Sequence, residues 1–344
     1  MILEILKVEL IDEIINSIKH KYNNEILDFL VKKTDTKTYL IITGNISVIT
    51  EEFLSTIDGC ELVMNSLKES YYFTSKKYKN NTEIKIMNQV IGNGDLTIIA
   101  GPCTIEDYDS LYKTAVQLKE AGVSVFRAMH KKPRTTPYNF QGVGQRGMEY
   151  MKRIRKELNI PVIMEVMDKE DIEMAKDGID IIQIGSRNMQ NYELIKCAAK
   201  SGIPTVLKKG LWCNNEQLLK AAEYFLAYGN ENVILCERGI QTHENMTRNT
   251  LDLSCVPIFK NMTHLPVMID PSHGTGRRDL IIPMSKAAVL LGADCLEIEV
   301  HIDPEKTIKP GDGYQTINIE HYKELLEEIK PILKMQNRKI NGVK

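Results

Sequence analysis

The chain has 344 residues, 43% of them hydrophobic, which is enough to bury a large core. Its 44 Lys and Arg residues nearly balance 46 Asp and Glu residues, so composition gives no reason to expect nucleic acid or an anionic membrane as a partner. No apolar run of about 18 residues predicts a membrane span. The opening MILEILKVEL is too short and too charged for a signal peptide, and the seven cysteines form no CxxC pair. We therefore expect a cytoplasmic protein with reduced thiols.

Residues 1–75 predict a small domain of alternating strands and helices. The segments ILEILKV, EILDFLV, TYLIITG and GCELVMNSL read as strands, and IDEIINSIKHKY and TEEFLSTI read as helices. Their order, βαββαβ, is that of the ferredoxin-like fold.

Residues 76–94 are polar and rich in turn formers, and they predict a linker with a hairpin at the base of the next domain. The segments EIKIMN and QVIGNG read as its strands, with an Asn-Gly turn at the end.

From residue 95 to 335 the pattern changes to eight short apolar strands that alternate with helical stretches. The predicted strands are 96–101, 123–127, 161–166, 179–185, 204–209, 232–237, 266–270 and 295–300. Eight such units predict a (β/α)8 TIM barrel. A doubly wound open sheet is the alternative, but it would favour GxGxxG after the first strand, where this chain has GPCTIE. We expect residues 336–344 to be a disordered polar tail.

Cations follow most of the predicted strands. In a TIM barrel, residues at the carboxyl ends of the strands build the active site. These cations are Arg127, Lys132, Arg134, Arg187, Lys208, Lys209 and Arg238. Each alone reads as a solvated surface charge, but converging like charges are costly to bury without a counter-ion. The set therefore predicts an anionic ligand with more than one phosphate or carboxylate group.

A second set of strand-end residues offers metal ligands. It consists of Cys103, His273, Glu299 and Asp312. Thiolate, imidazole and carboxylate together suit Mn²⁺, Fe²⁺, Co²⁺ or Zn²⁺ better than Mg²⁺ or Ca²⁺. Taken one at a time, the same residues also read as a core thiol, a capping histidine and ion-paired carboxylates.

Six motifs in this order carry a resemblance to a known family: IAGPCTIE, KPRTTPYNFQG, IGSRNMQN, CERG, DPSHGTGRRDL and IEVH. The chain resembles the type I 3-deoxy-D-arabino-heptulosonate 7-phosphate (DAHP) synthases, in the bacterial subgroup with an N-terminal ferredoxin-like regulatory domain. The KPRT segment separates it from the related 3-deoxy-octulosonate 8-phosphate synthases, which differ in that loop.

The resemblance implies a reaction and a role for each matching position. The reaction condenses phosphoenolpyruvate with erythrose 4-phosphate, the first step of the shikimate pathway to aromatic amino acids. The implied metal ligands are Cys103, His273, Glu299 and Asp312, of which Cys103 and His273 are also counted as catalytic. The residues implied to hold phosphoenolpyruvate are Arg127, Lys132, Arg187, Lys208 and Arg238, and those for the second phosphate are Arg134 and Thr135. Lys132 is a candidate proton donor to the new alkoxide.

The chain departs from the family pattern near the expected site. Where the family usually reads RGGAFKPRT, this chain has Ala128, Met129, His130 and Lys131 before Lys132. Further departures are Lys209, Trp212, Gln241 and His243. These changes put the substrate preference in doubt more than the reaction type. They leave open a 3-deoxy-octulosonate 8-phosphate synthase or another phosphoenolpyruvate-dependent paralogue, and a catalytically retired barrel that binds a metabolite is the alternative from another class.

The role of residues 1–75 also has two readings. The domain has no metal or phosphate motif, but its sheet edges are able to pair with another subunit. The resemblance implies a regulatory module that binds tyrosine or phenylalanine and closes over the barrel mouth, in a homotetramer. A spacer or an oligomer contact is the other reading.

Overall fold

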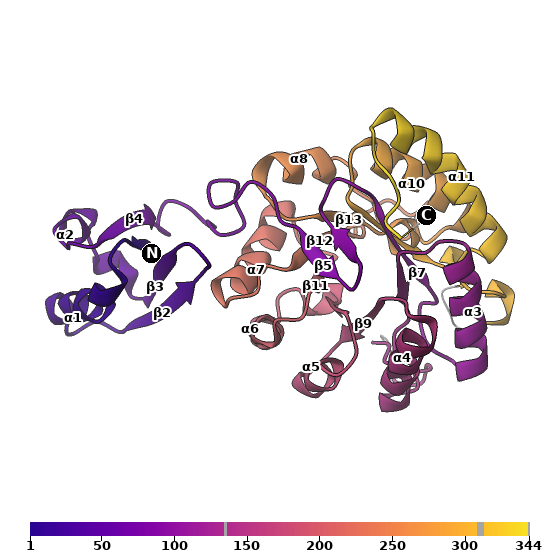
Figure 1. The fold of residues 1–344 in the computed structure, drawn as a ribbon, viewed down its shortest axis with the longest axis horizontal. Coiled ribbons are helices and arrows are strands. Elements are labelled where there is room, and N and C mark those ends of the chain that lie inside the picture. Colours follow the sequence, from indigo (N-terminus) through magenta and orange to yellow (C-terminus); the bar gives the residue numbers. More distant parts are fainter. Residues whose placement is uncertain (134–135, 308–312, 343–344) are drawn as a thin grey trace.

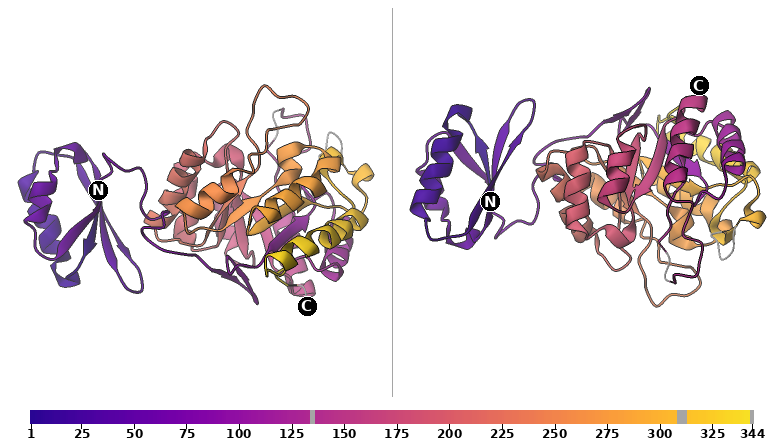
Figure 2. Two further views of the ribbon diagram at one scale, coloured as in Figure 1. Left: turned by 90° about the horizontal axis from the view of Figure 1, so that it is seen from above. Right: turned by 90° about the horizontal axis from the view of Figure 1, so that it is seen from below.

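The structure is a computed structural model that describes residues 1–133, 136–307 and 313–342. A small N-terminal sheet lies to one side of a much larger barrel, and a single extended segment joins them (Figure 1). Views from above and below show the same separation (Figure 2). No helix in the described ranges is long and apolar enough to cross a membrane.

The N-terminal sheet has four antiparallel strands in the order β2-β3-β1-β4. They are β1 (Ile2–Ile5), β2 (Leu27–Lys33), β3 (Thr38–Gly44) and β4 (Cys60–Met64). Helix α1 (Ile11–Lys21) covers the sheet with Ile14 and Ile18, which its 3.6-residue period places on one face. Helix α2 (Glu51–Ser55) starts where the Thr50 side chain accepts a hydrogen bond from the Phe53 amide. The predicted ferredoxin-like βαββαβ order is confirmed.

Eight parallel strands close into a barrel in the order β7 to β14, with β14 paired to β7, so the predicted TIM barrel is confirmed. The strands are β7 (Thr97–Gly101), β8 (Val125–Arg127), β9 (Val162–Val166), β10 (Ile181–Ile184), β11 (Thr205–Lys208), β12 (Val233–Glu237), β13 (Val267–Ile269) and β14 (Cys295–Glu299). They are almost wholly buried, as expected of parallel strands with barrel residues on one side and helices on the other.

Helices cover the outside of the barrel. They are α3 (Tyr108–Glu120), α4 (Gln145–Leu158), α5 (Lys169–Ala175), α6 (Tyr192–Ser201), α7 (Asn215–Ala227), α8 (Cys255–Met262), α10 (Ile281–Leu290) and α11 (Ile319–Met335). The short helix α9 (Pro271–Thr275) lies instead at the carboxyl ends of the strands and carries His273. Side-chain caps fix where several begin, such as Asp107 for α3 and the Asn214–Gln217 capping box for α7.

The predicted hairpin is present and closes the bottom of the barrel. Its strands β5 (Ile84–Ile86) and β6 (Gln89–Ile91) pair in antiparallel register. Ile84, Ile86 and Ile91 join one buried cluster with inward residues of the barrel strands. The two strands are joined at Met87 and Asn88, with Met87 at φ 50°, and the Asn93-Gly94 pair follows β6, with Gly94 at φ 99°.

Residues 336–342 pack against the barrel, whereas the sequence led us to expect a disordered tail over residues 336–344. The Leu96 amide donates to the Lys339 carbonyl at 2.7 Å, and the Asn341 amide donates to the Leu96 carbonyl at 2.8 Å. Ile340 is 8% exposed. Ile340 thus lies beside Leu96 in a parallel bridge just before the first barrel strand, a long-range contact that a polar composition does not reveal.

The segment between the two sheets is fastened to the barrel by Glu223 of α7. Its carboxylate accepts hydrogen bonds from the backbone amides of Tyr72, Phe73 and Thr74 at 2.8–2.9 Å and from the Thr74 hydroxyl at 3.0 Å. Four donors on one carboxylate hold this segment tightly. Bending between the two lobes is therefore confined to the residues before Tyr72.

Lys32 of β2 ties the N-terminal sheet directly to the barrel. Its ammonium group donates to the Leu226 carbonyl at 2.7 Å and to Glu231 at 3.1 Å, and it lies 5.2 Å from the ring centre of Phe73. The side chain is 4% exposed, so this cation contact is desolvated. Leu226 and Glu231 precede β12, so the N-terminal sheet docks toward the amino ends of the barrel strands.

We predict that Lys32→Met weakens the contact between the N-terminal sheet and the barrel. The change leaves the Leu226 carbonyl without its donor, whereas Glu231 stays paired with Lys79, so we expect a cost of about 2 kcal/mol of docking free energy. Trypsin should then cut the exposed linker after Lys68 several-fold faster, as measured by the time course of fragment release. The control is Lys33→Met, which changes the exposed neighbour on the same strand. Equal cleavage rates in both variants would show that Lys32 does not hold the lobes together.

Candidate active site

The described part of the barrel has a polar cavity of about 300 Å³ at the carboxyl ends of its strands. Its cationic lining residues are Arg127, Lys131, Lys132, Arg187, Lys208, Arg238 and Arg248. Cys103 and His273 line it as well, and Glu165 is its lining carboxylate. The structure thus brings together side chains from loops that are far apart in the sequence, as a barrel mouth does.

Cys103, His273 and Glu299 converge at one side of this cavity. Their ligand atoms all lie within 4.8 Å of one another, with 3.1 Å between His273 Nε2 and Glu299 Oε1. His273 Nδ1 donates to Asp270 Oδ2 at 2.7 Å, which turns Nε2 toward the other two residues. A thiol, an imidazole and a carboxylate in this arrangement fit a transition-metal ion. The fourth predicted ligand, Asp312, lies outside the described residues.

The charges around the triad favour a bound cation. Burial, and next the Glu299 charge, raise the pKa of the Cys103 thiol. Although burial acts in the opposite direction, His273 and Arg127 hold the pKa of Glu299 well below its usual value. Glu299 is thus a carboxylate, whereas Cys103 needs a nearby positive charge to become a thiolate.

Two predicted cations are locked into a buried chain of ion pairs. Arg127 lies 3.1 Å from Glu297 and 3.2 Å from Glu299. Lys208 lies 2.7 Å from Asp270 and 3.0 Å from Glu297. Burial opposes the charged forms, but the carboxylates outweigh it and raise the pKa values of both cations. Both side chains line the cavity and are charged at neutral pH.

Arg187 and Arg238 are the cations best placed to take an added anion. Within the described residues neither forms an ion pair, and Arg238 Nη1 is buried without a hydrogen-bond partner. Burial, together with neighbouring Arg248 and Arg187, lowers the pKa of Arg238. A buried, unpaired guanidinium is costly, so an anionic group in the cavity would offset this cost.

Lys132 reaches the triad from the loop after β8. Its ammonium group donates to Cys103 Sγ at 2.6 Å. The other predicted residues of this loop, Arg134 and Thr135, lie outside the described residues. The structure therefore joins Lys132 to the metal-ligand set and leaves the second phosphate site as a prediction.

Several residues of the site were missed in the sequence. Glu297 lies two positions before the predicted ligand Glu299 in the apolar strand CLEIEV, so both side chains point into the barrel, and the period-2 pattern could have added Glu297. Gln315 donates to Glu299 at 2.7 Å, but nothing in its local sequence marks it. Glu165 and Gln183 also line the cavity, 3.1 Å apart.

Comparison with known proteins identifies the family. Residues 75–335 match the sequence profile of the DAHP synthetase I family. The chain belongs to this family. It is 40% identical over 311 residues to a phospho-2-dehydro-3-deoxyheptonate aldolase of Thermotoga maritima, covering 90% of this chain and 91% of that protein. It is 32% identical over 270 residues to a 2-dehydro-3-deoxyphosphooctonate aldolase of Geotalea uraniireducens, covering 73% of this chain and 97% of that protein.

Solved structures agree with this assignment. The crystal structure of the Thermotoga maritima aldolase, also called DAHP synthase, covers 99% of each chain with a TM-score of 0.77 and 38% identity. A truncated form of the 3-deoxy-D-arabino-heptulosonate 7-phosphate synthase from Thermotoga maritima covers 79% of this chain and all of its own, with a TM-score of 0.73 and 40% identity. The likeness to the first structure includes the N-terminal sheet.

Two of the residues that depart from the DAHP synthetase pattern, His130 and Lys131, form a network of ion pairs behind the loop that carries Lys132. His130 Nε2 lies 3.0 Å from Asp171, and Lys131 reaches Asp171 at 2.7 Å and Asp168 at 2.9 Å. Gly147 of α4 leaves the necessary room, since a Cβ there would lie 2.7 Å from the His130 Cβ. The network anchors the backbone that leads into Lys132.

The other departures differ in how close they lie to the site. Met129 lines the cavity, and its sulfur accepts the Glu165 amide at 3.0 Å. Lys209 is buried and pairs with Glu237 at 2.5 Å. Trp212 is 77% exposed, and Gln241 and His243 are exposed as well. Only Met129 among these narrows the cavity itself.

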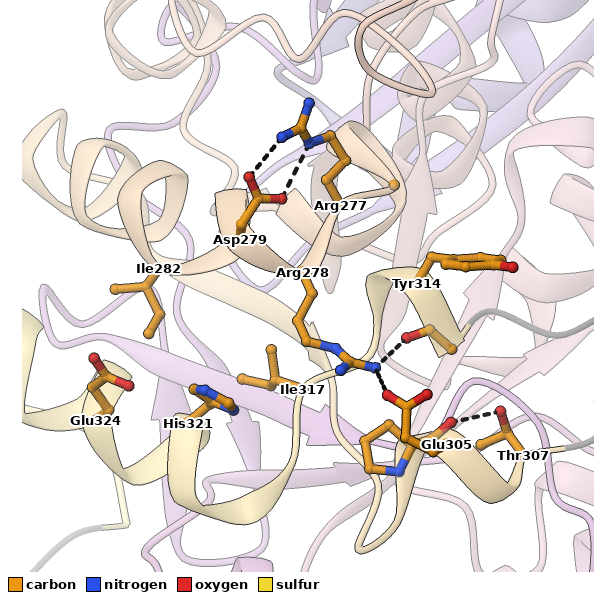
Figure 3. Close-up of a pocket in the computed structure, with 13 residues that line it drawn as sticks. Arg277, Arg278, Asp279, Ile282, Glu305, Thr307, Tyr314, Ile317, His321 and Glu324 are labelled. Atoms are coloured by element: carbon orange, nitrogen blue, oxygen red, sulfur yellow. Dashed lines mark hydrogen bonds and ion pairs between the residues drawn. The ribbon is translucent and has the colours of Figure 1, made fainter.

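A larger hollow of about 1070 Å³ lies outside the barrel, between α10, α11 and the loops around Tyr314. Figure 3 shows that the two arginines lining it each pair with a carboxylate. Arg277 donates to Asp279 at 2.7 Å, and Arg278 lies 2.8 Å from Glu305. Because these charges are already satisfied, the hollow offers less for an anionic substrate than the barrel mouth does.

We predict that Asp171→Asn destabilises the protein in a pH-dependent way. Burial opposes its ionisation, but His130, Lys131 and the Met167 amide lower the pKa of Asp171 to about 2, from an ordinary value of 3.8. Its ionised form should contribute about 2 kcal/mol above pH 4, and this is lost as the pH falls toward 2. Urea unfolding of wild type and variant at pH 7 and pH 3 measures the difference.

The control is Asp168→Asn, whose half-exposed carboxylate contacts the same Lys131. Its effect should stay below about 1 kcal/mol. A pH-independent difference for Asp171→Asn would contradict the proposed ionised network.

Proposed function

We propose that this protein is a metal-dependent synthase that condenses phosphoenolpyruvate with erythrose 4-phosphate and water, giving 3-deoxy-D-arabino-heptulosonate 7-phosphate and phosphate. This is the first step of the shikimate pathway. The observation that carries the proposal is the Cys103–His273–Glu299 triad, which lies at the same cavity as Arg187 and Arg238, two guanidinium groups that form no ion pair with any residue the structure describes. The family membership supports the same reaction.

The cations of the cavity hold phosphoenolpyruvate. Arg187 and Arg238 take its phosphate, while Arg127, Lys132 and Lys208 contribute positive potential to the phosphate and carboxylate. Because Arg127 and Lys208 are fixed by buried carboxylates, they do not have to reorganise when the substrate binds. The enol carbon C3 is thereby held in one orientation toward the aldehyde. Arg134 and Thr135 hold the phosphate of erythrose 4-phosphate.

A divalent ion held by Cys103, His273, Glu299 and Asp312 would supply a Lewis acid for the aldehyde oxygen. C3 attacks the aldehyde carbon, and Lys132 gives a proton to the oxygen that becomes a hydroxyl. The electron-poor C2 takes up water, and cleavage of its bond to the phosphate oxygen then releases phosphate and forms the ketone. Lys132 is suited to this proton transfer because its ammonium group lies 2.6 Å from Cys103, within the ligand set.

We predict that phosphate release from phosphoenolpyruvate depends on a divalent metal and on erythrose 4-phosphate. A chelator should abolish turnover, Mn²⁺ should restore it, and Cys103→Ala should lower kcat at least about 100-fold, since it removes a direct ligand. The control is Cys213→Ala, which changes a buried cysteine outside the triad.

Arabinose 5-phosphate, assayed in parallel, distinguishes the related octulosonate reaction. Faster release with this sugar would move the assignment to that reaction, and Met129 in the cavity would then be the residue to test. No release with either sugar would favour a retired barrel.

The N-terminal sheet is proposed to be a regulatory domain that responds to tyrosine or phenylalanine in a homotetramer. Lys32 docks it toward the amino ends of the barrel strands, whereas the cavity lies at their carboxyl ends. A domain in this position is able to influence the cavity only by moving or by acting on another subunit. A ligand shifts such an equilibrium if it binds one arrangement more tightly.

We predict that tyrosine or phenylalanine inhibits the full chain and that deletion of residues 1–70 removes the inhibition but not the turnover. The deletion stops before Tyr72 so that the segment bound by Glu223 stays in place. Turnover across a series of both amino acids, with alanine as the control ligand, measures the effect. A flat response in the full chain, or equal inhibition of both forms, would leave the domain as a spacer.

A further inference from the structure

Gln315 connects the cavity to the metal-ligand set. It ends the short helix η6 (Gly313–Gln315) and is 3% exposed. Its Nε2 donates to Glu299 Oε2 at 2.7 Å, and its Oε1 accepts from Arg248 Nη1 at 2.8 Å. One buried amide thus bridges a cation that lines the cavity and a carboxylate of the triad.

The bridge requires an amide in one orientation. The guanidinium of Arg248 offers only donors, and the carboxylate of Glu299 offers only acceptors. If the amide were turned over, its NH2 would face Arg248 and its oxygen would face Glu299, and both contacts would be lost. A hydrocarbon side chain at this position would leave both charged neighbours without the bridge.

Gln315 also decides how Glu299 is turned. Glu299 Oε1 is held on the other side by His273 at 3.1 Å and Arg127 at 3.2 Å. With Oε2 held by Gln315, both oxygens have fixed partners, and the carboxylate plane cannot rotate. Fixing a ligand through an outer hydrogen bond is how proteins commonly raise metal affinity.

Arg248 lies in the cavity that we expect to bind the anionic substrate. It lines the cavity with Arg187 and Arg238, and its charge contributes to lowering the pKa of Arg238. Its backbone amide donates a hydrogen bond to the Thr275 carbonyl at 2.8 Å, so a response of Arg248 to an anion would be made by its side chain. An anion that draws or orders this guanidinium changes the position of Gln315, and through it that of Glu299.

We infer that Gln315 is a positioning residue that couples the binding of the phosphorylated substrate at Arg248 to the metal affinity of the Cys103–His273–Glu299 triad. The inference rests on the proposed function, since it takes phosphoenolpyruvate as the anion. Coupling of this kind is reciprocal, so the anion tightens metal binding by the same factor as metal tightens anion binding. This coupling ensures that the second substrate meets a site that already holds both the metal ion and phosphoenolpyruvate.

The test measures Mn²⁺ binding without turnover. Full-length protein is stripped of metal, and Mn²⁺ is titrated while the free ion is followed by electron paramagnetic resonance. The titration is done with and without phosphoenolpyruvate and with no sugar phosphate. In the wild type we expect phosphoenolpyruvate to tighten Mn²⁺ binding at least about 5-fold. In Gln315→Met we expect Mn²⁺ binding to weaken about 10-fold and the phosphoenolpyruvate effect to fall below about 2-fold.

Arg278→Met is the matched control. Arg278 holds the same segment by donating to the Gly313 and Thr316 carbonyls at 2.7 Å, but it touches neither Glu299 nor the cavity. This variant should keep the wild-type coupling factor even if its absolute metal affinity changes. Arg248→Lys, which keeps the charge but not the fork that reaches Gln315, should lose coupling as Gln315→Met does and serves if that variant does not fold.

The outcomes separate the inference from the proposed function. Undiminished coupling in Gln315→Met or Arg248→Lys overturns the inference, and so does loss of coupling in Arg278→Met, which would assign it to loop order. Wild-type protein that binds both ligands without coupling overturns it too. Wild-type protein that binds neither Mn²⁺ nor phosphoenolpyruvate overturns the proposed function instead.

Discussion

The barrel mouth depends on a chain of buried charges in which each cation lies between two carboxylates. Arg127 lies between Glu297 and Glu299, and Lys208 lies between Asp270 and Glu297. Removing any one member would leave an uncompensated charge at a site with almost no solvent, which is costly. This series of ion pairs therefore fixes the carboxyl ends of four strands relative to one another. It also supplies the triad with two of its supports, since Asp270 orients His273 and Arg127 orients Glu299.

This arrangement divides the cations of the cavity into two kinds. Arg127 and Lys208 are paired with carboxylates and give the cavity a rigid wall, whereas Arg187 and Arg238 form no ion pair among the described residues. An incoming phosphate group would neutralise the charges of Arg187 and Arg238. Rigid charges preorganise a site, and unpaired charges provide its affinity. The His130–Asp171 network extends the same principle to the loop that carries Lys132.

The two lobes are joined by contacts that differ in strength along the linker. Glu223 holds the segment from Tyr72 through Thr74 by four hydrogen bonds. Lys32 adds a buried cation contact between the N-terminal sheet and the barrel. Loss of the Lys32 contact would weaken the docking of the sheet but leave Tyr39 packed on Tyr72, Phe73 and Tyr78. A domain that regulates by changing its position needs such a separable attachment, because only a weakly held element responds to a ligand of modest affinity.

The sequence by itself determined the fold class and the identity of most site residues. Period-2 and apolar-run patterns locate all eight barrel strands, and motif residues at strand ends converge in a TIM barrel whatever their separation in sequence. Three of the four expected metal ligands lie together, while Asp312 falls outside the described residues. Tertiary structure alone decided which cations are neutralised, that Gln315 bridges Arg248 and Glu299, and that Ile340 packs against the first strand. Partners of buried charges and the ends of a chain are set by long-range contacts, which local sequence patterns do not encode.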